Sequence, residues 1–168
     1  TQLSIGDQLL HAMRQWASGI GVAAAELDGV RHGMTVSSFT SVSVEPPIVL
    51  ISAQNGTRTH DLILRAGAFA VTLLSNRQQE ISEIFAGRVP EHEDRFAGLE
   101  VVTLQTGSPV LPGGLAAFDC RLVGTYETDT TTVMFGEVVE ARVSDRPLED
   151  LAPLLYYNRG YRFLEGEQ

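Results

Sequence analysis

Residues 35–43 carry a high density of hydroxyl side chains. Six of these nine positions are Ser or Thr, three are apolar, and two prolines follow at positions 46 and 47. Hydroxyl groups both donate and accept hydrogen bonds, and small side chains let a flat ligand approach the backbone closely. The segment therefore suits a planar heterocycle whose edge mixes carbonyl and N–H groups. The alternative is an edge strand facing water, where Ser and Thr are also common. In a single strand, alternate residues face opposite sides, with Thr35, Ser37, Phe39 and Ser41 on one face and Ser38 and Thr40 on the other.

Residues 52–67, SAQNGTRTHDLILRAG, predict a second polar site. A strand runs into an Asn-Gly turn and then into a helix that opens with Thr57, Arg58 and Thr59. Free N–H groups and the positive end of the helix dipole attract anions, and the hydroxyls and the guanidinium add further donors. The two segments together predict a cradle for a ring beside a pocket for a phosphate. The alternative is that Thr57 only caps the helix and that Arg58 is a solvated charge.

The composition is that of a soluble globular protein, and we expect residues 1–168 to form a single domain. With 12 Lys and Arg against 21 Asp and Glu, the net charge is −9. This balance argues against nucleic acid as a partner, so an anionic ligand needs a local site. The single cysteine excludes a disulfide framework and favours a reducing compartment. No apolar run approaches the roughly 20 residues of a membrane span, and no signal peptide is visible, so we expect a cytoplasmic protein.

Strands dominate the elements that would position these segments. Hydrophobic spacing, turn pairs and capping residues predict helices over 4–18, 58–66 and about 75–85, and strands over 20–27, 30–39, 46–53, 69–74, 115–122 and 132–143. The apolar run 46–53 predicts a strand covered on both faces, and Gly136 predicts a bulge. In strand 115–122, Cys120 is expected on the apolar face and Asp119 on the polar face. A short helix and a tail with three tyrosines would close the chain. Because the strands mostly neighbour one another, we expect a mainly β fold with flanking helices, an antiparallel barrel.

Several longer motifs follow one another along nearly the whole chain. The most specific are GMTVSSFTSVSVEPP at 33–47 and FAVTLLSNRQQEIS, followed by FAG, within 69–87. DRFAGLE, GSPVLPGGLAAFDCRL, FGEVVEARV and PLLYYNRGYR come after them. In this order the motifs resemble the flavin reductase family, the small reductase components of two-component flavin-dependent monooxygenases.

The resemblance implies an FMN-binding split β-barrel of Greek-key type, usually a homodimer with the flavin near the subunit interface. It implies an NAD(P)H:flavin oxidoreductase that reduces FMN or FAD with NADH or NADPH. Hydride would pass from nicotinamide C4 to flavin N5, and the reduced flavin would leave for a partner oxygenase. The flavin supplies the chemistry, so no catalytic side chain is assigned.

The same resemblance assigns the cofactor contacts to particular residues. The isoalloxazine ring would contact Thr35, Val36, Ser37 and Ser38; the ribityl chain and phosphate would contact Ala53, Gln54, Thr57 and Thr59; and Phe85, Ala86 and Gly87 would lie beside the cofactor. Arg58 is added as a cofactor-binding candidate from the anion-site argument above, and the resemblance does not assign it.

One family motif is absent. Members commonly carry Gly-Asp-His before the strand that leads to FGEV, and that histidine is associated with the nicotinamide. The corresponding residues here are Asp129, Thr130 and Thr131. Thr130 and Thr131, with Tyr161 and Arg162 of the C-terminal segment, are therefore the candidates on the nicotinamide side. The loss leaves an alternative function: a protein of the same fold that keeps its flavin and acts on another substrate, or a non-enzymatic flavin carrier.

Other chemically capable residues favour structural roles. The four histidines, at positions 11, 32, 60 and 92, lack metal-binding spacing, so no metal site is expected. The acidic run Glu91–Asp94 reads as a solvated loop, with a lid over the pocket as the alternative. Cys120 is expected to be a packed thiol. Tyr156, Tyr157 and Tyr161 are expected in the core or at an interface.

Overall fold

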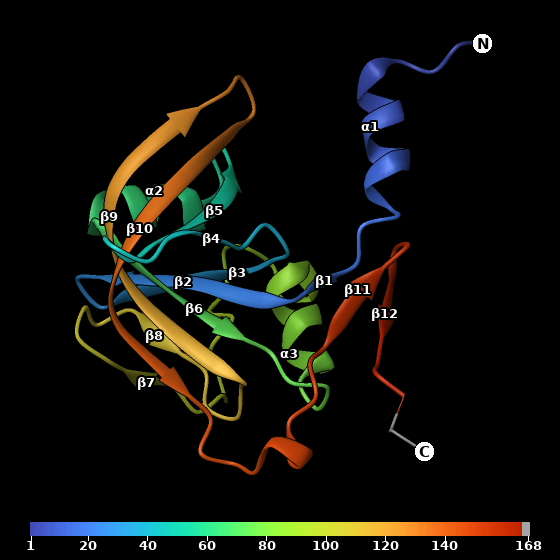
Figure 1. The fold of residues 1–168 in the computed structure, drawn as a ribbon. Coiled ribbons are helices and arrows are strands. Elements are labelled where there is room, and N and C mark those ends of the chain that lie inside the picture. The colour runs from blue at the N-terminus through green and yellow to red at the C-terminus, as the bar shows by residue number, and fades with distance from the viewer. Residues whose placement is uncertain (166–168) are drawn as a thin grey trace.

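The computed structural model describes residues 1–165, so residues 166–168 of the expected domain lie outside the described part of the chain. Within it, antiparallel strands form a main sheet in the order β3-β2-β6-β9-β10-β5-β4, which curls into a barrel (Figure 1). No pairing among residues 1–165 joins the two edge strands, β3 and β4. The predicted antiparallel split barrel is thus confirmed. The strand bounds are β2 Gly21–Leu27, β3 Val30–Val36, β4 Thr40–Ser43, β5 Ile48–Gln54, β6 Ala68–Leu73, β9 Ala116–Glu127 and β10 Thr131–Val143.

Two local devices shape this sheet. The β2–β3 hairpin turns at Asp28 and Gly29, whose φ angles of 52° and 79° suit the twist of a two-residue hairpin. In β10 the register against β9 shifts at Gly136, which confirms the predicted bulge. A Cβ at Gly136 would lie 2.6 Å from Phe69 Cζ and 2.7 Å from Cys120 Cβ. Glycine is required there because the barrel core passes too close to the backbone for any side chain.

Short elements surround the barrel. Strand β1 Ser18–Gly19 pairs with β11 Leu155–Tyr157, which pairs with β12 Gly160–Arg162, while β7 Val102–Thr103 pairs with β8 Pro109–Val110. The helical elements are α1 Ile5–Met13, α2 Arg58–Ala66, α3 Gln79–Glu83, the π-helical turn η1 Ile84–Arg88 and the 3₁₀ turn η2 Leu148–Asp150. No helix within residues 1–165 combines the length and apolar character needed to cross a membrane.

The predicted boundaries of α2 are confirmed. Thr57 caps its N-terminus by accepting a hydrogen bond from the N–H of His60, and Gly67 ends it with a φ of 66°, the left-handed conformation that favours glycine. Leu62 and Ile63 bury its apolar face in the barrel core, whose buried members also include Ile51, Phe69, Val71, Cys120 and Met134. This packing fixes the N-terminus of α2 at the end of β5.

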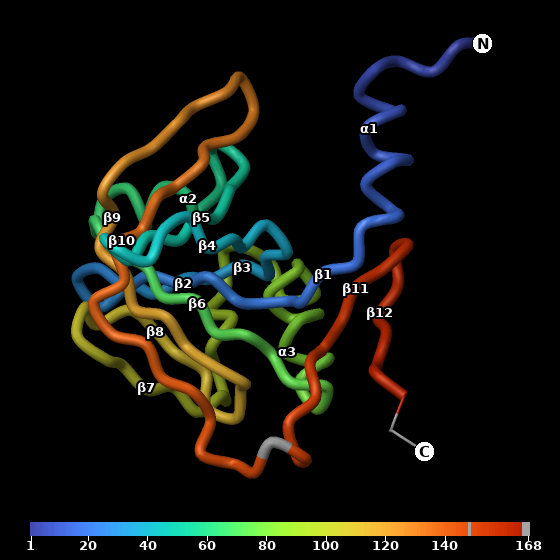
Figure 2. Tube along the Cα trace, in the orientation of Figure 1, coloured from blue at the N-terminus to red at the C-terminus, as the bar shows by residue number. Residues whose placement is uncertain are grey.

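The N-terminal helix is shorter than predicted. Ser4 caps it as expected, but it ends at Met13 and buries none of its residues. Leu9, Met13 and Trp16, predicted to share an apolar face, are 60%, 53% and 70% exposed. Figure 2 shows that α1 stands apart from the barrel, and directly after Met13 the chain bonds to the β11–β12 hairpin instead, through Arg14 with Asn158 and Gln15 with Tyr157. Isolated short helices are marginal in water, which explains the early end.

The hydroxyl-rich segment is not one strand, as predicted, but two. Strand β3 ends at Val36, the chain bends at Ser37, and β4 begins only at Thr40. The expected alternation of faces across residues 35–41 is therefore wrong, because the chain leaves the sheet between the two strands. Strand β5 also differs from prediction: its burial alternates, so it is covered fully on one face only.

Two further predictions near the C-terminal half are corrected. Asp119 lies opposite the apolar face as predicted, yet it is fully buried, because the N–H groups of Gln105 and Thr106 cover its carboxylate at 2.7 and 2.8 Å. The expected tail is the β11–β12 hairpin. Its turn residues Asn158 and Arg159 both have positive φ, and an Asn-Arg pair is not a typical hairpin signal.

Candidate functional site

A cavity of about 410 Å³ lies between the end of β3, the N-terminus of α2 and the α3–η1 segment. It brings together residues that the sequence predicted separately. Its lining includes three residues predicted to contact the isoalloxazine ring, Thr35, Val36 and Ser37, and three predicted to contact the ribityl chain and phosphate, Gln54, Thr57 and Thr59. It also includes Phe85 and Ala86, predicted to lie beside the cofactor, and Tyr161 of the C-terminal hairpin. A pocket of this volume accepts a drug-sized or cofactor-sized ligand.

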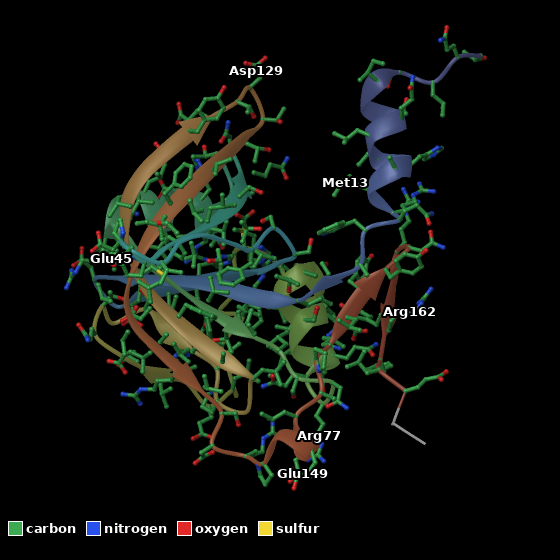
Figure 3. All side chains as sticks on the ribbon, viewed as in Figure 1. Met13, Glu45, Arg77, Asp129, Glu149 and Arg162 are labelled. Carbon is green, nitrogen blue, oxygen red and sulfur yellow. The ribbon has the colours of Figure 1, made fainter. Side chains whose placement is uncertain are left out.

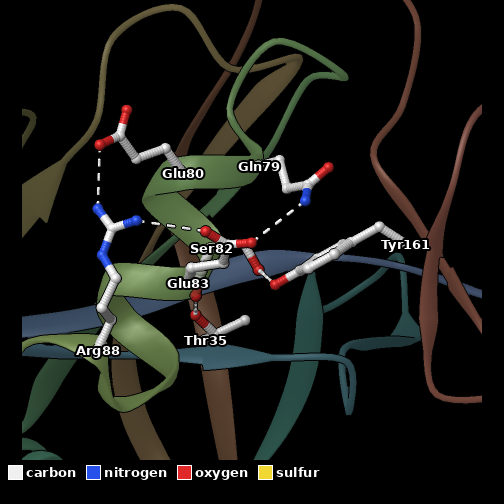
Figure 4. Close-up of polar contacts among 7 residues, drawn as sticks. All are labelled: Thr35, Gln79, Glu80, Ser82, Glu83, Arg88 and Tyr161. Atoms are coloured by element: carbon white, nitrogen blue, oxygen red, sulfur yellow. Dashed lines mark hydrogen bonds and ion pairs between the residues drawn. The ribbon is translucent and has the colours of Figure 1, made fainter.

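The wall formed by α3 and η1 is held by polar contacts, shown in Figure 4. Thr35 Oγ1 of β3 donates to the carbonyl oxygen of Ser82 at 2.6 Å, and Ser82 Oγ lies 2.9 Å from the hydroxyl of Tyr161. Arg88 pairs with Glu80 and Glu83 at 3.0 and 3.3 Å. The hydroxyl proton of Thr35 is thus already used, so this side chain offers a ligand only its oxygen lone pairs.

Aromatic packing places the apolar part of this wall. Phe85 is buried at the cavity edge and meets Phe96 edge to face, with ring centroids 4.7 Å apart. A Cβ at Gly33 of β3 would lie 3.1 Å from the Phe85 ring, so the strand passes directly against it. The apolar ring and the adjacent β3 backbone form a narrow surface suited to a flat ligand.

The polar end of the cavity is built around His32. This side chain is buried, with Nδ1 2.6 Å from Thr59 Oγ1 and Nε2 3.0 Å from the carbonyl oxygen of Glu91. Burial, reinforced by the positive charges of Arg95 and Arg58, lowers the pKa of His32 to about 4. The ring is therefore neutral at pH 7. Because a carbonyl can only accept, Nε2 carries the proton, and Thr59 must donate to Nδ1.

The loop 88–98 reaches this end of the cavity, which the preferred solvated-loop interpretation did not anticipate. Glu91 lines the cavity, its carboxylate accepts from the N–H of Arg58, and its carbonyl accepts from the Arg58 guanidinium at 3.0 Å. An ion pair between Arg31 and Asp94 at 2.9 Å ties the loop to β3. All four residues of the run Glu91–Asp94 are exposed, which agrees with the solvated-loop interpretation, and the lid alternative stays a prediction.

Arg95 is a lining residue that the site prediction missed. Its Nε donates to the carbonyl oxygen of Val89 at 2.9 Å, and its Nη1 donates to that of Gly33 at 2.9 Å. Burial lowers the pKa of Arg95 from its usual value, yet a guanidinium stays charged at neutral pH. The DRFAGLE motif that contains Arg95 was the available signal. For Glu91 the lid alternative was the available signal, whereas for His32 the sequence offered none, because its contacts with Thr59 and Glu91 are long-range.

Four predicted cofactor contacts lie outside the lining of this cavity. Ser38 accepts from the N–H of Ser52 at 3.1 Å and lines a neighbouring groove. Ala53 is buried in the core. The guanidinium of Arg58 donates to the carbonyl oxygen of Glu91. Gly87 has a φ of 121° within η1, where it serves the turn. Whether any of these residues contacts a ligand stays a prediction.

The nicotinamide-side candidates are divided. Tyr161 lines the cavity, whereas Thr130, Thr131 and Arg162 do not. Thr131 pairs across the sheet with Gln54, at the tip of the β9–β10 hairpin where Figure 3 labels Asp129. The guanidinium of Arg162 donates to the carbonyl oxygen of Tyr161 at 3.0 Å and lies on the outer side of the C-terminal hairpin (Figure 3).

A second groove of about 760 Å³ adjoins the cavity. The two share Ile20, Val36, Ser37 and Tyr156. The groove runs between α1 and the barrel, with Met13 directed towards the gap in Figure 3. A ligand in the cavity can therefore extend past the end of β3 into the groove.

Comparisons with known proteins agree with this architecture. Residues 13–165 match the family described as flavin reductase like domain. The chain is 39% identical over 153 residues, 91% of it and 86% of the relative, to "FMN reductase (NADH) RutF 2" of Methylorubrum extorquens. It is 38% identical over 94% of its length, and 86% of the relative, to the reductase component of the "FADH(2)-dependent resorcinol hydroxylase" of Rhizobium sp.. The solved structure of the styrene monooxygenase flavin reductase from Pseudomonas putida superimposes with a TM-score of 0.82 at 33% identity, covering 96% of this chain and 99% of that one.

Proposed function

We propose, from the premise that this chain belongs to the flavin reductase-like domain family, that it is an NADH-dependent flavin reductase. It would supply reduced FMN or FAD to a flavin-dependent monooxygenase. Relatives carry the matching names "FMN reductase (NADH)" and "NADH-dependent flavin reductase". The observation that carries the proposal is one cavity in which the end of β3, the N-terminus of α2 and the η1 segment converge. The alternative of a retained flavin or a passive carrier is not favoured by these relatives.

The residues of the cavity fit a flavin nucleotide. Its apolar wall of Val36 and Phe85 suits a flat ring, and the hydroxyls and backbone of Thr35 and Ser37 offer polar groups at the ring edge. Gln54, the N-terminus of α2 and the charged Arg95 offer donors for a ribityl chain and a phosphate. Both halves of the ligand thus find matching chemistry in one cavity.

The chain's own part in the reaction is to bind and position. The two nucleotides supply the chemistry, with hydride passing from nicotinamide C4 to flavin N5. The β3 backbone and Phe85 would orient the flavin ring, and hydrogen-bond donors near its edge would stabilise the negative charge that develops there. Tyr161, held by Ser82, would border the nicotinamide. The histidine that family members commonly carry for this purpose is absent from this chain.

Flavin-dependent NADH consumption tests the proposal directly. We expect oxidation of NADH that rises with added FMN or FAD and stops without flavin; parallel assays with NADPH measure the donor preference. Ala86→Trp should fill the cavity and abolish turnover, because Ala86 is exposed on the cavity wall. Ala97→Trp is the matched control, since Ala97 is also exposed, on the 88–98 loop, but does not line the cavity. A yellow protein that ignores both nicotinamides would contradict the proposal.

We also propose that the working form is a cytoplasmic homodimer. The support is the apolar face of α1, where Leu9, Met13 and Trp16 are exposed beside the second groove, since large exposed apolar faces mark interaction sites. Light scattering should give twice the chain mass of 18.2 kDa. Met13→Glu should shift the mass towards the monomer, and a monomeric wild type would contradict the dimer.

A further inference from the structure

Glu91 occupies the place where an anionic ligand would meet α2. The N–H of Arg58, the first residue of α2, donates to the Glu91 carboxylate. The next N–H groups are partly used as well, because that of His60 donates to Thr57 Oγ1 at 3.4 Å. The positive end of the α2 dipole, predicted as a phosphate site, therefore already holds an anion that belongs to the chain itself.

The backbone of Glu91 is held by hydrogen bonds that do not involve its carboxylate, which itself accepts only from the N–H of Arg58 among the hydrogen bonds of residues 1–165. Its carbonyl oxygen accepts from His32 Nε2 and from Arg58 Nη1, both at 3.0 Å. The Arg31–Asp94 ion pair fixes the loop three residues further on. The residue as a whole is exposed, so its carboxylate can leave α2 without disturbing the loop. A carboxylate placed in this way competes for the helix end and can still be displaced.

We propose that Glu91 is a specificity-determining residue that disfavours the terminal phosphate of FMN, and this inference rests on the flavin-binding function proposed above. A phosphate monoester carries a charge of about −1.5 to −2 at pH 7. At the N-terminus of α2 this phosphate would approach the negatively charged carboxylate of Glu91, which must be displaced before the phosphate can bind there. Riboflavin has no phosphate and meets no such competition. The bridging phosphates of FAD each carry one charge, so FAD should be affected less than FMN.

Titration of the flavin-free protein with FMN, FAD and riboflavin, followed by flavin fluorescence, tests this role. We expect Glu91→Gln to lower the Kd for FMN about tenfold, which corresponds to about 1.4 kcal/mol. FAD affinity should rise less, and the Kd for riboflavin should change less than twofold. The FMN effect should shrink in high salt, because added ions screen the repulsion.

Glu93→Gln is the matched control. Glu93 is exposed on the same loop and its loss changes the net charge equally, but it does not line the cavity. Its FMN affinity should stay within twofold of the wild type. Equal tightening by both variants would show a general charge effect and overturn the inference. So would an unchanged Glu91→Gln variant, or one that binds FMN and riboflavin more weakly. Absence of any flavin binding by the wild type and both variants would instead refute the proposed function and, with it, this inference.

Discussion

Burial of His32 makes the stability of this protein sensitive to mild acid. The pKa of His32 is lowered to about 4 from 6.5, so the unfolded chain takes up a proton at higher pH than the folded chain. Stability therefore falls as the pH falls from about 6.5, and the loss levels off below about 4. Thr59 donates to the ring, and burial together with the positive charges of Arg95 and Arg58 lowers the pKa of His32 more than the carbonyl and the carboxylate of Glu91 raise it.

The size of the effect follows from the two pKa values. At 1.36 kcal/mol per pKa unit, the full gap corresponds to about 3 kcal/mol. Integrated between pH 7.5 and pH 5, His32 should cost the folded state about 2 kcal/mol. Carboxylates titrate in the same range, so the measured quantity must be a difference between two proteins that share them.

His32→Gln provides that comparison. A glutamine amide can still donate to the Glu91 carbonyl but does not titrate, so the variant should lose about 2 kcal/mol less than the wild type between pH 7.5 and pH 5. Urea unfolding followed by far-ultraviolet circular dichroism is the suitable assay, because Trp16 is 70% exposed and reports poorly on the core. Parallel pH dependences in the two proteins would refute the assignment of a neutral, buried His32.

Three further changes test other parts of the structure. Thr57→Ala combined with Thr59→Ala should raise the flavin Kd about tenfold by removing the helix cap and the partner of His32, and an unchanged Kd in fluorescence titration would remove the phosphate assignment. Gly136→Ala should destabilise the fold by about 1–3 kcal/mol in urea, because its Cβ would meet Phe69 at 2.6 Å. Asp119→Ala should cost about 1–3 kcal/mol by leaving the N–H groups of Gln105 and Thr106 without their carboxylate partner, and a melting temperature equal to the wild type would contradict this.

Much of the fold could be predicted because its signals are local. Thr57 and Gly67 delimit α2 through capping, and Asp28-Gly29 sets the β2–β3 hairpin. These residues act on backbone groups a few positions away, so their effect does not depend on the rest of the molecule. Predictions that needed tertiary knowledge were less accurate: the helix at 4–18 was too long, and the burial of Asp119 was missed.

The sequence alone was enough to predict the barrel, the family and the two segments that supply most of the cavity. The reason is that the order of the motifs and the helix caps depends only on residues close together in the chain. Only the tertiary structure decided which of their hydroxyls remain available, since Thr35 and Thr59 give their protons to Ser82 and His32. It also decided that Glu91 and Arg95 border the same cavity. The physical reason is that loop 88–98 is placed by partners such as Arg31, 63 positions away from Asp94 in the chain, and no local pattern encodes contacts of that range.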